Sequence, residues 1–72
     1  MYSRNELVFL LSYIEKHITE GNEHIVAMRR LVVDGDRQRL DMAEAKVRLA
    51  EFLTRQAQRE ERREQVLRAL DN

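Results

Sequence analysis

The residues of this chain with the clearest chemical potential are two histidines and the acidic residues near them. His17 and Glu20 are three residues apart, and Glu20 and His24 are four apart, so on a helix they share one face. Imidazole nitrogens and carboxylate oxygens are common ligands of zinc and related metals. His17 and His24 are two turns apart, about 10.5 Å along a helix axis, too far to bind one ion together. A site would need a third ligand from Glu44, Glu51 or a second subunit. The alternative, which we adopt, is that both histidines flank an apolar seam, with no metal or cofactor bound.

A second candidate is the cluster of arginines in the last third of the chain. Arg55, Arg59, Arg62 and Arg63 could contact the phosphates of RNA or DNA. Glutamates are interleaved with these arginines, and 13 basic residues balance 13 acidic ones, whereas nucleic-acid binders usually carry a basic excess. We expect a solvated helical face here, and nucleic-acid binding remains the alternative.

Catalytic motifs are missing from the sequence. There are no cysteines, and Ser3 and Ser12 have no histidine and acid at a suggestive spacing. Neither a glycine-rich phosphate loop nor the metalloprotease pattern H-E-x-x-H is present. We therefore expect that the protein is not an enzyme.

The candidate residues lie on helices, because apolar residues recur at alternating steps of four and three. In the first half of the chain this seam consists of Leu7, Leu11, Ile14, Ile18, Gly21, Ile25, Met28 and Val32. Such spacing is typical of a coiled-coil-like helix. Ser3 and Glu6 have the spacing of a capping box, which predicts a start near residue 4. The unbroken register favours a continuous helix through Gly21, and a helix end at this glycine is the alternative.

A break follows at Asp34-Gly35-Asp36, where glycine suits a helix C-terminus and Asp36 suits the next N-cap. We predict one domain over residues 1–72, with a helix at about 4–33, a turn at 34–36 and a helix at about 37–70. The second seam comprises Met42, Ala45, Leu49, Phe52, Gln56, Arg59, Arg63, Val66 and Leu70. With no proline and two glycines, the fold class is all-α, an antiparallel helical hairpin.

The first helix carries more apolar surface than this hairpin covers. Folding about Gly35 places residue i opposite roughly residue 70 − i, so Gly21 faces Leu49, and Leu7 to Ile14 face a polar stretch. Burial is worth about 25 cal/mol per Å², so we expect two copies to associate as a homodimer of four helices. The predicted interface consists of Leu7, Phe9, Leu10, Leu11, Ile14 and Ile18. A larger protein partner is also compatible with this surface.

The densest apolar run, Leu7 to Leu11, is shorter than the roughly 20 residues that span a membrane. It also lacks the pattern of a signal peptide. We therefore expect a cytoplasmic protein without a membrane partner.

The stretch H-I-x-E-G-x-x-H-I from His17 to Ile25, followed later by Leu49, Phe52 and Gln56, resembles small bacterial α-helical hairpin proteins of unknown function. The resemblance covers about residues 15–60 and implies a stand-alone hairpin, without implying an activity. Those proteins tend to have histidines in the turn and in the middle of the second helix. This chain has Asp36 and Arg59 there, so the resemblance does not imply a shared metal site.

Overall fold

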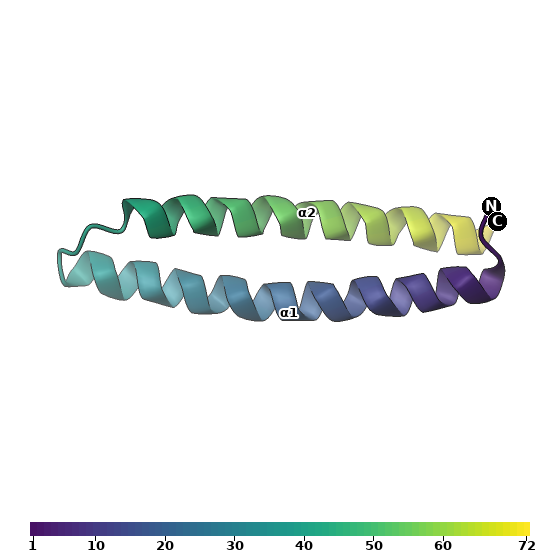
Figure 1. Ribbon diagram of the computed structural model, residues 1–72, viewed down its shortest axis with the longest axis horizontal. Helices are drawn as coiled ribbons and strands as arrows, with labels where there is room; N and C mark the ends of the chain where they lie inside the picture. The colour runs from purple at the N-terminus through teal and green to yellow at the C-terminus, as the bar shows by residue number, and fades with distance from the viewer.

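Two long helices packed side by side in opposite directions make up the computed structural model, which describes all 72 residues (Figure 1). Helix α1 spans Arg4–Arg37 and helix α2 spans Ala43–Asp71. The chain forms a rod of 52 × 14 × 14 Å. The connection lies at one end of the rod and both termini lie at the other end. The prediction of an all-α helical hairpin is confirmed.

The start of α1 has the predicted capping box. The Ser3 hydroxyl accepts a hydrogen bond from the Glu6 amide at 3.2 Å, and the Glu6 carboxylate accepts one from the Ser3 amide at 3.3 Å. These two bonds satisfy donors that the first helical turn leaves free. The helix then continues without interruption through Gly21, so the continuous alternative is the correct one.

The end of α1 differs from the prediction, because the helix passes through Gly35 and ends at Arg37. Arg39 takes the left-handed conformation, with φ at 59°. The amide of Arg39 donates to the Asp36 carbonyl at 3.1 Å and that of Leu40 donates to the Gly35 carbonyl at 2.9 Å. This pair of bonds is a Schellman motif whose left-handed position is filled by arginine instead of glycine.

Helix α2 consequently begins later than expected, at Ala43 instead of residue 37. Asp36 belongs to the last turn of α1 and does not cap α2. The Asp41 carboxylate accepts a hydrogen bond from the Ala43 amide at 3.0 Å, while the N-cap residue Met42 makes no side-chain cap. The connection between the helices therefore comprises residues 38–42.

Gly35 has a packing role that explains the longer helix. It continues the α1 seam three residues after Val32, and it is buried. A Cβ atom at this position would overlap the Met42 side chain. The missing side chain thus lets the connection pack closely against the helix, and glycine is required for space and not for a positive φ.

This longer helix changes the register of the hairpin by about one heptad. Gly35 lies against Met42, and Gly21 lies against Gln56 instead of Leu49. Heptad steps from these two pairs place Leu7 opposite Leu70, in agreement with the 3.1 Å hydrogen bond from Arg4 Nη1 to the Leu70 carbonyl. The predicted register was therefore wrong.

The core of the hairpin is thin. Its buried apolar side chains are Ile14, Ile25, Val32 and Val66. Every other residue of the two predicted seams is buried or half-buried, which confirms the helical faces that meet. No side chain is fully enclosed, as expected for two helices without a third layer.

Neither helix combines the length and apolar character that crossing a membrane requires.

Candidate binding face around Gly21

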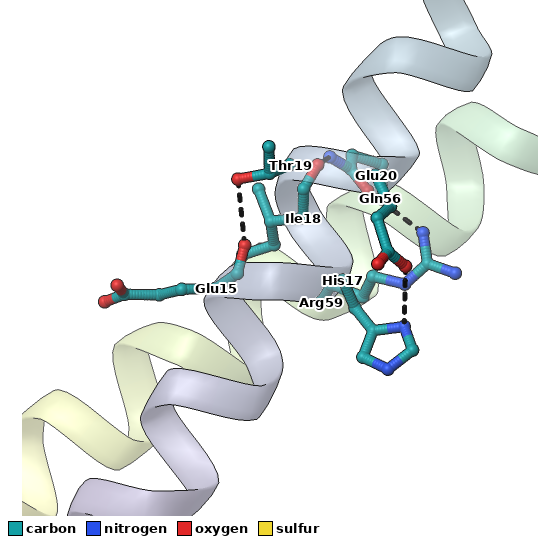
Figure 2. A network of polar contacts seen from close by, with 7 residues as sticks. All are labelled: Glu15, His17, Ile18, Thr19, Glu20, Gln56 and Arg59. Carbon is teal, nitrogen blue, oxygen red and sulfur yellow. Dashed lines mark hydrogen bonds and ion pairs between the residues drawn. The ribbon is translucent and has the colours of Figure 1, made fainter.

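A buried glutamine interrupts the apolar seam halfway along the hairpin (Figure 2). Gln56 is only 5% exposed. Its Nε2 donates to the Ile18 carbonyl at 2.6 Å and to Asn22 Oδ1 at 3.0 Å. Its Oε1 accepts from Arg59 Nη1 at 3.0 Å. The amide therefore has partners for both donors and its acceptor, as a buried polar group requires.

Gly21 makes this arrangement possible. A Cβ atom there would overlap Gln56 Oε1 and would lie 2.8 Å from Arg59 Nη1. The two side chains thus lie against bare backbone of α1. The cost of glycine within a helix, about 1 kcal/mol relative to alanine, is offset by the hydrogen bonds that this close approach allows.

A shallow pocket of about 210 Å³ opens beside Gly21. Its walls come from both helices and consist of His17, Glu20 and His24 on α1 and Phe52, Arg55 and Arg59 on α2. Figure 2 shows His17, Glu20 and Arg59 on the same side of α1, whereas Glu15 points to the opposite side. An adjoining pocket is lined by Tyr13, His17, Arg59 and Arg62. We call this side the histidine face, defined by His17, Glu20, His24, Arg55, Arg59 and Arg62.

The two histidines lie on one face as predicted, but each has a separate environment. His17 Nδ1 is 3.9 Å from Glu20 Oε2, and its ring lies 4.4 Å from that of Tyr13. The His24 ring meets Phe52 edge-on, with centroids 6.1 Å apart. No group of three or more histidine or acidic side chains is arranged to hold a metal ion.

The arginines of α2 do not form one continuous ridge. Arg63 turns to the opposite side, where its Nε is 3.4 Å from Glu15 and its Nη1 is 3.8 Å from Glu64. The groove on that side is lined by Ile18, Glu60, Glu61, Arg63 and Glu64. Of the interleaved charges of α2, Arg55, Arg59 and Arg62 thus lie on the histidine face. Glu60, Glu61 and Glu64 lie on the other side together with Arg63.

The predicted interface residues divide into two groups. Ile14 is buried within the hairpin, and Leu7, Leu11 and Ile18 are half-buried against α2. Phe9, by contrast, is 75% exposed, and the half-buried Leu10 lies beside it. The first group therefore belongs to the hairpin's own core.

Two tyrosines outside the predicted interface extend the exposed group. Tyr2 lines one hollow with Phe9 and Leu10, and Tyr13 lies one turn beyond Phe9 with 56% of its surface exposed. We call Tyr2, Phe9, Leu10 and Tyr13 the aromatic surface.

The chain matches no protein-family model, no curated protein and no solved structure.

Proposed function

We propose that this protein is a non-catalytic helical interaction module that associates with a second copy of itself through the aromatic surface. The observation that carries the proposal is the exposure of Phe9, which leaves 75% of its surface in water beside three other large side chains. Contiguous apolar surface of this kind usually marks a protein interface. The seam residues of α1 pack against α2, and this packing fixes the side of the helix on which Phe9 is exposed.

The total exposed area supports association. The hairpin exposes 5966 Å² at a mass of 8.6 kDa. A compact monomer of that mass would expose about 4,700 Å², so the excess is about 1,300 Å². A stable protein interface removes about 800 Å² from each partner, an area that the excess can supply.

A second copy of the chain can cover the aromatic surface without any other protein. Two hairpins related by a twofold axis would bring their aromatic surfaces together and form a four-helix assembly. In the observed register Leu7 and Leu11 face apolar residues of α2. Fewer apolar side chains are therefore left exposed to drive self-association than the predicted register implied. The exposed aromatic residues, and not the whole N-terminal seam, provide the contact. The absence of cysteines in the sequence suits an assembly that works in the cytoplasm.

The experiment is sedimentation equilibrium of the wild type, Phe9→Glu and a control, Val47→Glu. Val47 is also an exposed apolar residue, at 59%, but it lies on α2 far from the aromatic surface. Burial of a phenylalanine is worth about 2 kcal/mol, and a twofold dimer contains two of them. Phe9→Glu should therefore weaken the dimer by about 4 kcal/mol, or roughly a thousandfold.

We expect the wild type and Val47→Glu to sediment at twice the chain mass and Phe9→Glu to sediment at the chain mass. All three should have the same helical content by circular dichroism, because neither site is in the core. A wild type that remains monomeric at hundreds of micromolar would refute self-association. In that case the aromatic surface would have to serve a different protein.

Nucleic-acid binding through Arg55, Arg59, Arg62 and Arg63 has less support in this geometry. Arg63 lies with glutamates on the opposite side of the hairpin. The four arginines therefore do not lie along the single track that a phosphate backbone would need.

A further inference from the structure

We propose that the pocket beside Gly21 binds the phosphate group of a small molecule. Two arginines and two histidines line this pocket, with Glu20 as its only carboxylate. Arg55, Arg59 and Arg62 form no ion pair with any carboxylate of the chain, in contrast to Arg48 and Arg63. The histidine face therefore presents arginines without an ion pair, and no glutamate of α2 lines the pocket itself.

Arg59 is held in place before any ligand arrives. Its Nη1 donates to Oε1 of the buried Gln56, and Gln56 is itself fixed by Ile18 and Asn22. A guanidinium carries five N–H donors, so most of them remain free for an anion. A side chain fixed by a buried partner loses less entropy on binding than a free one. Packing alone would have been served by an apolar residue at position 56.

The size and the rings of the pocket limit the ligand. A volume of about 210 Å³ is below the usual range of drug-sized ligand sites, but it accommodates a phosphate group. Phe52 and His24 lie at one side, and the rings of Tyr13 and His17, tilted 55° to each other, lie at the other. Aromatic rings beside a phosphate-binding arginine suit a nucleotide base, which stacks on such rings. The recognised chemistry is the phosphate group, carried either by inorganic phosphate or by a nucleotide.

The test is a titration of the ¹⁵N-labelled full chain, followed by amide chemical shifts at constant ionic strength maintained with chloride. The probes are inorganic phosphate, adenosine monophosphate, adenosine and a short single-stranded oligonucleotide. The variant is Arg55→Gln, because Arg55 is exposed and lines the pocket. The matched control is Arg48→Gln, which removes the same charge one heptad away, outside the pocket.

We expect saturable shifts at Gly21, His17 and His24 with inorganic phosphate or adenosine monophosphate. Arg55→Gln should weaken binding about tenfold, the usual effect of losing one charge-assisted hydrogen bond, and Arg48→Gln should change it less than twofold. Tighter binding of the nucleotide than of inorganic phosphate identifies a nucleotide site, whereas equal binding identifies a site for phosphate alone.

Four results would overturn the proposal. They are shifts that do not saturate, equal effects of the two arginine variants, adenosine binding as tightly as its monophosphate, and an oligonucleotide binding more than tenfold tighter than the monophosphate. The last result would assign the histidine face to a polynucleotide. Tyr13 belongs to the aromatic surface and also adjoins this pocket. The same titration of Phe9→Glu, which should be monomeric, therefore tests the pocket independently of self-association.

Discussion

The contact between Gly21 and Gln56 predicts that an added methyl group will have opposite effects in two backgrounds. In the wild type, a Cβ at position 21 overlaps the Gln56 carboxamide, so the amide must leave its place. It then loses its bonds to the Ile18 carbonyl, Asn22 and Arg59, each worth about 1 kcal/mol net. Alanine regains about 1 kcal/mol of helix propensity over glycine. Gly21→Ala should therefore lower the free energy of unfolding by about 2 kcal/mol.

In a Gln56→Ala background the obstructing amide is gone. The same Gly21→Ala change should then raise the free energy of unfolding by about 1 kcal/mol, through helix propensity alone. The two effects differ by about 3 kcal/mol, which is the coupling energy of the double-mutant cycle. This coupling energy is at the upper end of the range for residues in contact, because one methyl group at position 21 displaces an amide that makes three hydrogen bonds.

The assay is urea unfolding of all four proteins, followed by circular dichroism at one protein concentration. A constant concentration matters because self-association would add a concentration-dependent term to the apparent stability. A coupling energy below about 0.5 kcal/mol would refute the reasoning, since it would mean that Gln56 moves aside at no cost.

Three further substitutions test other parts of the hairpin in the same assay. Ser3→Ala removes the acceptor of the capping box and should lower the free energy of unfolding by about 1 kcal/mol. An unchanged urea midpoint would mean that the first turn frays in solution. Arg39→Gly removes the steric cost of a left-handed conformation and should raise the free energy of unfolding by about 1 kcal/mol. A lower free energy of unfolding would show that the Schellman motif does not form. Ile25→Ala removes a core side chain that is 6% exposed and should cost about 3 kcal/mol. A cost under about 1 kcal/mol would contradict the burial of Ile25.

The helical faces could be predicted from the sequence because they depend on local periodicity. An apolar residue every three or four positions fixes which side of each helix meets the other, independently of the turn. The polar members of the second seam, Gln56, Arg59 and Arg63, were placed correctly for the same reason. The capping box likewise depends on residues three apart, and both of its bonds are present.

The register could not be predicted in the same way, because it depends on where the first helix ends. Gly35 was interpreted as a terminating residue from its neighbours Asp34 and Asp36. The contrary signal was its position, three residues after Val32, which continues the seam. Gly21 occupies the equivalent seam position two heptads earlier, and both glycines make room for a side chain of the facing segment. The sequence alone therefore could not distinguish a glycine that ends the helix from a glycine that makes room for a neighbouring side chain.

For this reason the two halves of the candidate site were predicted as separate candidates, the histidines on α1 and the arginines on α2. His17, Glu20 and His24 share a face by local spacing, but their neighbours on α2 depend on the register. With residue 70 − i opposite, His17 would have lain near Leu53 instead of Arg59. The different positions of Arg59 and Arg63, on opposite sides of the hairpin, also depend on their neighbours in α1, which the sequence of interleaved charges does not reveal.

Because the seam residues alternate strictly at steps of four and three, the two helices pack in repeats of seven residues. Each heptad of α1 faces one heptad of α2, so excising seven residues from each arm at facing positions would preserve every remaining contact. Such an excision would shorten the rod by about 10 Å, and residues 18–24 with 53–59 form one such facing pair. Removal of three or four residues would instead rotate one apolar stripe away from the other. Natural length variation in a protein built this way should therefore occur in paired multiples of seven.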